Sequence, residues 1–329
     1  MLSRVADSIF WMSRYIERAE NVARFIDVNC HLILDLPVGS AEQWEPLIIT
    51  SGDQERFAAR YGAASTQENV IRFLAFDSEN PNSIVSCLRA ARENARSVRE
   101  IISSEMWEQI NTFYLMASAP DAGRRAGTAP HEFFTEIKSA SHLFTGLTET
   151  TMSHGEAWHF CRLGRLLERA DKTTRLLDVK YFMLLPRLTA VGSPFDDIQW
   201  SAVLRSASAF EMYRKRYGRI APDRIVEFLL LDREFPRAVH SCLNSAEESL
   251  HAISGTPIGT FRNPAEQRLG QLRSELGYAR VDDILAGGLH EFLDGLQAKL
   301  NAAGDAIFET FFALRPIGAG AARYGGVQA

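Results

Sequence analysis

A charged motif occurs twice in this chain of 329 residues. The first copy occupies residues 14–28 and the second residues 165–179, so the copies stand 151 positions apart. In both, Arg, Glu-Arg-Ala, Arg and Asp-Val recur at the same relative positions. Apolar residues in each copy recur at steps of three and four, which is the period of an amphipathic helix. The sequence therefore predicts two long helices built on one pattern.

The repetition extends well beyond this motif. Residues 60–62 return as 216–218, 73–81 as 228–236, 86–88 as 241–243 and the His-Glu-Phe block at His131 as the one at His290, with spacings between 151 and 159. We interpret the His-Glu-Phe blocks as repeated packing elements rather than an acid–base pair. Alternating runs of β-branched residues are missing, so no sheet is expected. We predict an all-α fold of two tandem, pseudo-symmetric helical units that share a core and reflect internal duplication: 1–152 and 153–315, then a flexible tail at 316–329.

Proline and turn residues set the predicted limits of the helices. The two motif helices should run from residue 2 to before Pro37 and from residue 154 to before Pro186, because proline ends a helix at the preceding residue. Asn80 and Pro81 should begin a single helix over 81–115. Residues 116–129 are predicted to be a loop, and residues 281–313 a closing helix.

Each motif helix carries a charged face opposite its apolar stripe. Arg14 and Arg18 are like charges one turn apart, which is unfavourable unless a carboxylate lies between them. The face has three interpretations: reciprocal Arg–Glu pairing between the copies across a pseudo-twofold axis, a site for an anionic group, or a solvated surface with exposed ion pairs. The candidate residues are Arg14, Glu17, Arg18, Asn21, Arg24, Arg165, Glu168, Arg169, Lys172 and Arg175.

A second basic feature occurs in the first half only. Arginines at steps of three, four and three residues should line one face of the helix predicted over 81–115: Arg89, Arg92, Arg96 and Arg99. At the matching positions the second half has Asn244, Glu247, His251 and Ser254. Guanidinium groups donate paired hydrogen bonds to carboxylate or phosphate, so the stripe is a candidate site for an anionic substrate or partner. The alternative is a surface stripe balanced by Glu93 and Glu100.

The composition narrows the classes of function. A net charge of −5 and a pI of about 6.0 argue against a nucleic-acid partner. The four cysteines form no Cys-x-x-Cys pair, which suits a reducing compartment. No apolar run approaches the roughly 20 residues of a membrane span. We therefore expect a cytoplasmic protein without a membrane contact. Phosphate loops and dinucleotide motifs are absent, so no cofactor is predicted. His154, Glu156 and His159 do not align on one helix face, so no metal is predicted.

Taken together these features resemble the alpha-E family, an all-helical family of bacterial proteins named for its helices and Glu-Arg motif. The resemblance covers nearly the whole chain and rests on residues 1–4, 11–21, 43–44, 73–81, 89–99, 107–111 and 164–171. Ser13 stands where the family usually has glycine. Members are commonly encoded beside, or fused to, ATP-grasp ligase-like and transglutaminase-like proteins. The resemblance therefore implies a part in making or modifying peptide-type amide bonds, and it supplies no catalytic residues.

Three hypotheses for function follow. The first is an accessory partner of an ATP-grasp-type ligase or a transglutaminase-like enzyme, in which the arginine stripe holds an anionic partner or a peptide or amino-acid ligand. The second is an enzyme acting on an amino-acid or peptide substrate, with Glu17 or Glu168 as acid/base and the motif arginines gripping carboxylates. The third is a purely structural helical scaffold. The enzyme requires a cavity that reaches Glu17 or Glu168, whereas the scaffold requires both carboxylates to be buried and paired.

Overall fold

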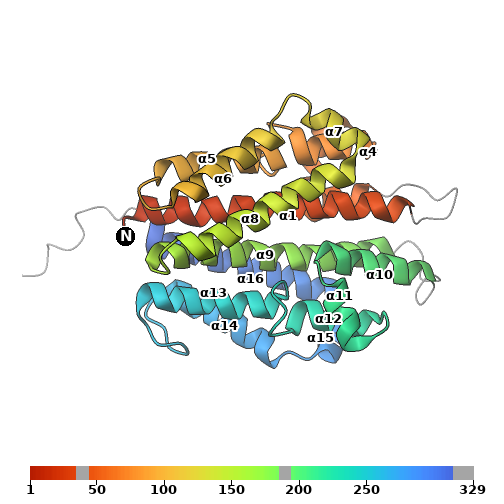
Figure 1. Ribbon diagram of the computed structural model, residues 1–329. Coiled ribbons are helices and arrows are strands. Elements are labelled where there is room, and N and C mark those ends of the chain that lie inside the picture. The colour runs from red at the N-terminus through yellow and green to blue at the C-terminus, as the bar shows by residue number, and fades with distance from the viewer. Residues whose placement is uncertain (35–43, 185–193, 314–329) are drawn as a thin grey trace, which may run out of the picture.

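Two long helices lie side by side at the centre of the molecule. A computed structural model describes residues 1–34, 44–184 and 194–313. In it, α1 (Ser3–Leu34) runs along α9 (Glu156–Leu184), and the other helices cover this pair on both sides (Figure 1). The described ranges contain no strand, so the all-α prediction is confirmed.

The two outer layers each follow one central helix in the chain. α5 and α8 make most of the contacts with the outer side of α1, whereas α2 packs mainly against α9. The helices between α1 and α9 in the chain are α2 (Glu45–Ser51), α3 (Gln54–Tyr61), α4 (Gln67–Ile71) with the π-helix η1 (Arg72–Phe76), α5 (Ile84–Ser97), α6 (Ser104–Ala117), α7 (Ala122–Thr128) and α8 (Pro130–Thr151). α13 and α16 make most of the contacts with the outer side of α9, whereas α10 and η3 also pack against α1. The helices that follow α9 in the chain are α10 (Pro194–Ser206), α11 (Phe210–Tyr217), α12 (Pro222–Leu231), α13 (Val239–Ser254), α14 (Pro264–Tyr278), α15 (Val281–Gly287), α16 (Leu289–Ile307) and the π-helix η3 (Phe308–Phe312).

Small residues let the central helices approach each other closely. A Cβ atom added to Gly164 would lie 2.3 Å from the carbonyl oxygen of Phe10. Glycine is therefore the residue that fits at this point of α9 without moving α1. In the first motif the matching position is Ser13, whose hydroxyl donates a hydrogen bond to the Cys161 carbonyl at 2.5 Å. The serine thus uses the same narrow contact to tie α1 to α9.

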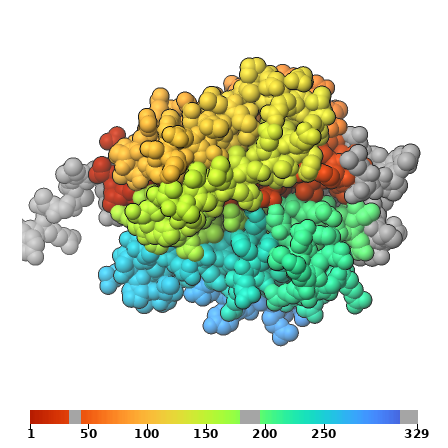
Figure 2. Space-filling model, viewed as in Figure 1, coloured from red at the N-terminus to blue at the C-terminus, as the bar shows by residue number. Residues whose placement is uncertain are grey.

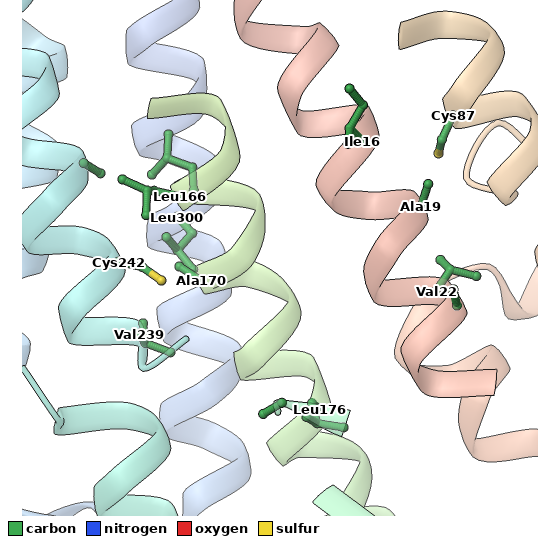
Figure 3. Packing of buried hydrophobic residues seen from close by; sticks show 14 of the residues in the cluster. Ile16, Ala19, Val22, Cys87, Leu166, Ala170, Leu176, Val239, Cys242 and Leu300 are labelled. Carbon is green, nitrogen blue, oxygen red and sulfur yellow. The ribbon is translucent and has the colours of Figure 1, made fainter. Parts of the chain in front are cut away.

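Each central helix also packs against a cysteine of its outer neighbour. Ala19 of α1 lies opposite Cys87 of α5, and Ala170 of α9 lies opposite Cys242 of α13 (Figure 3). All four side chains are buried. Burial raises the pKa of the Cys87 thiol to about 12 and that of Cys242 to about 11. Both thiols are therefore protonated and behave as small apolar residues in a core that extends through both layers.

Three segments differ from the sequence prediction. The helix expected over 81–115 is two helices, because the Ser103 hydroxyl accepts a hydrogen bond from the Met106 amide at 3.1 Å and caps the new helix α6. The predicted loop 116–129 contains α7, which buries Ala122 and Ala126 one turn apart. The helix expected over 281–313 is interrupted at Gly288, whose φ of +98° favours glycine.

No helix of the described ranges is both long and apolar enough to cross a membrane. The predicted tail at 316–329 and Gln43 lie outside the described residues. The division into two duplicated units stays a prediction.

Candidate functional site

The two Glu-Arg motifs meet across the interface between α1 and α9. Arg18 donates from Nε and Nη2 to the carboxylate of Glu168, at 2.6 and 3.0 Å. In the opposite direction, Arg169 donates from Nε and Nη2 to Glu17, at 2.9 and 2.8 Å. Both pairs have the two-pronged geometry that makes arginine–carboxylate contacts strong. Glu17 is 2% exposed and Glu168 is fully buried, so this face is the interior of the molecule and not a solvated surface.

Further cations complete the surroundings of Glu168. Arg14 lies 3.0 Å from one carboxylate oxygen, and the Lys172 ammonium lies 3.6 Å from the other. The Arg14 guanidinium also stacks over the Trp11 ring at 4.8 Å, a favourable cation–π contact. The like charges of Arg14 and Arg18 are thus tolerated because one buried carboxylate lies between them.

Arg237 completes the surroundings of Glu17, and it was missed in the sequence analysis. This buried side chain donates to Glu17 at 3.1 Å and to Asn21 at 3.3 Å, and it also binds Glu20. Asn21 in turn donates to Glu17 at 3.0 Å. We refer to Arg14, Glu17, Arg18, Glu168, Arg169 and Arg237 as the Glu-Arg cluster.

Alignment of the two copies of the repeat could have identified Arg237. Arg237 directly follows the proline that ends the block 228–236, and the matching residue of the first half is Asn82. Asn82 accepts a hydrogen bond from Arg18 at 2.8 Å. The two matching positions therefore both contact the cluster. Asn82 supplies an amide oxygen to Arg18, and Arg237 supplies a guanidinium to Glu17.

Arg24 lies farther along α1 and is also held within the protein. It donates to Glu20 at 2.8 Å and to Ser208 at 2.5 Å, and it lies 2.8 Å from His142 Nε2. Ser141 donates to the second oxygen of Glu20 at 2.6 Å. This group joins α1 to α8 and to the segment after α10.

Three candidates of the second motif do not pair with the first motif. Arg165 matches Arg14 in the repeat, yet it binds Glu149 of α8 at 2.9 Å. Arg175 binds Asp171 of its own helix at 2.9 Å, and Lys172 lies 3.2 Å from the same carboxylate. Reciprocal pairing between α1 and α9 is therefore centred on the two Glu-Arg pairs and does not extend along the whole charged face.

The cluster keeps both glutamates ionised. Burial by itself would raise the pKa of Glu17, but Arg169 and Arg237 outweigh it, and the net shift is downward. Burial is likewise outweighed at Glu168, where Arg18, Lys172 and Arg14 hold the pKa well below its ordinary value. A general acid or base needs a pKa near the working pH and access to the substrate. Neither glutamate lines the two cavities of about 820 and 690 Å³ found among the described residues. This geometry is that of a structural ion-pair cluster.

A family profile described as a predicted alpha-helical domain with a conserved ER motif, named Alpha-E, matches residues 1–312. The chain belongs to the Alpha-E family. In this alpha-E protein, the Glu-Arg pairs at 17–18 and 168–169 bind each other across the two central helices.

The alpha-E protein also matches longer mycobacterial proteins. It is 23% identical over 337 residues to uncharacterised proteins of Mycobacterium bovis and of two strains of Mycobacterium tuberculosis. Each match covers 94% of this chain but 37% of the relative, so the chain spans little more than a third of the length of these relatives. No solved structure matches it significantly.

The four arginines of the predicted stripe do not share one helix in this alpha-E protein. Arg89, Arg92 and Arg96 lie on α5, but Arg99 lies in the turn that follows α5. The expectation of one continuous helical stripe was wrong because the chain turns before the Ser103 cap. Arg92 and Arg99 nevertheless lie over the same Trp107 ring, at 5.9 and 4.9 Å from its centroid. The helices α5 and α6 lie in the upper part of Figure 2.

Residues of α6 support two of these arginines. Arg92 donates to Asn111 at 2.7 Å, and the Arg99 guanidinium lies over the Trp107 ring at 4.9 Å. Arg96 projects outward with 66% of its side chain exposed and pairs with Glu93 at 2.8 Å. We refer to Arg89, Arg92, Arg96 and Arg99 as the arginine face.

The two His-Glu-Phe blocks contact the Asp-Val ends of the motifs. His131 Nδ1 lies 2.9 Å from an Asp27 oxygen, and His290 Nδ1 lies 2.6 Å from an Asp178 oxygen. The hydrogen bond with Asp178 raises the pKa of His290. Each histidine thus ties α8 or α16 to a central helix, as expected of a repeated packing element.

Proposed function

We propose that this alpha-E protein is a non-catalytic helical accessory unit that works with an ATP-grasp-type ligase or a transglutaminase-like enzyme in peptide (amide-bond) synthesis or modification. The observation that supports it most is the Glu-Arg cluster. Its two glutamates are buried, and each carboxylate accepts two hydrogen bonds from one arginine. The lowered pKa of each glutamate keeps it ionised. Because these glutamates are buried and paired, binding of a partner would use residues on the surface of the protein.

The length of the relatives supports a role beside another protein unit. The match covers 37% of each mycobacterial relative, so about 63% of each lies outside it. That remainder has room for one or more further domains. A helical unit joined to other domains in one polypeptide is suited to act beside an enzyme, as the association of the family with ATP-grasp-like and transglutaminase-like proteins implies.

The arginine face is the surface that we assign to the partner or substrate. Within this face, Arg89, Arg96 and Arg99 are exposed, and Glu93 is the carboxylate that pairs with Arg96. Trp107 beneath Arg99 limits the freedom of that guanidinium, so less side-chain entropy is lost when it binds. The face can therefore donate paired hydrogen bonds to the carboxylates of an acidic protein surface or peptide.

A capture experiment tests this assignment. The tagged protein is used to isolate partners from extracts of its source, together with an Arg96→Glu/Arg99→Glu variant and the control Arg280→Glu, whose side chain is 75% exposed and lies outside the face. We expect wild type and control to retain an ATP-grasp-type or transglutaminase-like protein that the double variant loses. Retention by the folded double variant would refute the assignment to this face. Capture of neither enzyme would leave the scaffold hypothesis as the better account.

The hypothesis of an enzyme that uses Glu17 or Glu168 gains no support from the geometry. Proton transfer by either glutamate would require opening the α1–α9 interface and breaking a bidentate arginine pair. The cost of leaving a buried charge unpaired is several kcal/mol.

A further inference from the structure

Three side chains with metal-binding atoms meet where the start of α8 reaches the last turns of α1. Asp27 and His31 lie one turn apart on α1, and His131 lies near the first turn of α8. One ligand atom from each residue lies within 4.8 Å of the other two. Among the described residues, this is the group of three such side chains whose ligand atoms come together. We propose that it binds a divalent transition-metal ion, with Zn²⁺ as the ion that fits best.

The spacing of the three groups is close to that of a zinc site. Zinc binds imidazole nitrogen and carboxylate oxygen at about 2.0–2.2 Å, so neighbouring ligand atoms of a tetrahedral site are about 3.3 Å apart. His131 Nδ1 is already 2.9 Å from Asp27 Oδ1. The rings of His31 and His131 are perpendicular, with centroids 4.6 Å apart, and their side chains are 47% and 62% exposed. Both rings are therefore free to make the small movement that closes the site.

Neighbouring groups orient the ligands. The Lys138 ammonium donates to Asp27 Oδ2 at 2.5 Å, which leaves Oδ1 toward the two histidines. His31 Nδ1 lies 2.8 Å from the Asp27 carbonyl oxygen and 3.6 Å from Asp27 Oδ1, so the backbone contact holds this ring beside the carboxylate. Hydrogen bonds of this kind fix metal ligands in many sites.

The donor set selects the class of ion. Two imidazoles and one carboxylate oxygen favour zinc and its neighbours in the first transition row over Mg²⁺ and Ca²⁺, which prefer all-oxygen sites. The Lys138 charge further disfavours ions held only by electrostatic attraction to Asp27. Three protein ligands leave a tetrahedral ion one open position.

A cavity lies beside the proposed metal site. All three ligands line a cavity of about 690 Å³, whose lining also includes three cations and two carboxylates: Arg24, Lys138, Arg205, Asp197 and Glu211. The cavity thus gives water access to the ion, which suits water as the fourth ligand.

The second half provides a natural control. Asp178 and His290 make the same aspartate–histidine contact at 2.6 Å. However, the residue 151 positions after His31 is Phe182, so the second half lacks one ligand. The sequence prediction of no metal overlooked the first-half group because His131 is 104 residues from Asp27 in the chain.

Calorimetric titration of the full chain with ZnCl₂ at neutral pH tests the proposal, with Co²⁺ absorption as a readout of coordination geometry. We expect one zinc per chain, and a loss of affinity of at least about tenfold in His31→Ala and in His131→Ala. His290→Ala, which alters the matching two-residue pair, should bind as wild type does. Absence of zinc binding by wild type would overturn the proposal, as would zinc binding that both first-half variants retain. Because the His31 side chain is half exposed, its replacement tests the site without disturbing the core.

Discussion

Replacing Glu168 by glutamine should destabilise the protein far more than replacing a surface glutamate. The carboxylate is fully buried and contacts Arg14, Arg18 and Lys172. Glutamine has nearly the same shape but no charge, so the substitution leaves three cations around a neutral amide. The packing of α1 against α9 is otherwise preserved.

The expected magnitude follows from burial. Breaking a buried ion pair by removing one partner costs about 3–5 kcal/mol. The cationic side chains around Glu168 are 11–17% exposed, so water reaches them in part, and we expect a loss near the lower end, about 3 kcal/mol. The control is Glu275→Gln, because Glu275 pairs with Lys299 at 2.5 Å while both side chains are more than half exposed. That pair should contribute about 0–1 kcal/mol.

Urea unfolding followed by circular dichroism measures both effects. Each variant is compared with wild type through its midpoint and slope, and an unchanged slope indicates that the compactness of the end states is preserved. If Glu168→Gln lowers the free energy of unfolding no more than Glu275→Gln does, the reasoning that the cluster stabilises the interior is refuted.

Two further perturbations probe the same interface. The folded-state pKa values of Glu17 and Glu168 lie below the ordinary 4.5, so the stability that these groups contribute is complete above that pH and is lost as the pH falls toward the folded values. The urea midpoint of wild type should therefore fall more steeply below pH 4.5 than that of Glu168→Gln; parallel curves would contradict this. Gly164→Ala should destabilise by about 1–3 kcal/mol, because its Cβ would lie 2.3 Å from a backbone oxygen. Gly146→Ala, whose Cβ meets nothing within 4 Å in α8, should be neutral or stabilise by up to about 1 kcal/mol; equal melting shifts for the two would argue against the close helix contact.

The sequence predicted the structural features that depend on the local pattern of residues and on the internal repeat. The three- and four-residue steps of apolar side chains indicated the two central helices, and the repeated Glu and Arg indicated pairing between them. The two copies of the motif face each other on neighbouring helices, so Arg18 binds Glu168 and Arg169 binds Glu17. Such reciprocity can be inferred from two similar motifs without coordinates.

Features that depend on distant packing could not be predicted in the same way. Arg237 is 220 residues from Glu17 in the chain. It reaches the cluster because it stands just before α13, which packs against α9. Arg165 binds Glu149 because α8 ends near the start of α9. The break before α6 depends on a serine cap, which competes with helix continuation and is hard to distinguish from a serine inside a helix.

The most direct test of the central claim, that the Glu-Arg motifs hold the two central helices together, is a double-mutant cycle on Glu17 and Arg169. The free energies of unfolding of Glu17→Gln, Arg169→Met and the double variant are measured against wild type in urea. Residues in direct contact typically couple by about 0.5–3 kcal/mol, and the bidentate geometry at 2.8 and 2.9 Å in a buried site predicts a coupling of at least about 1 kcal/mol. Strictly additive losses would contradict the claim, because they would mean that the two motifs do not depend on each other.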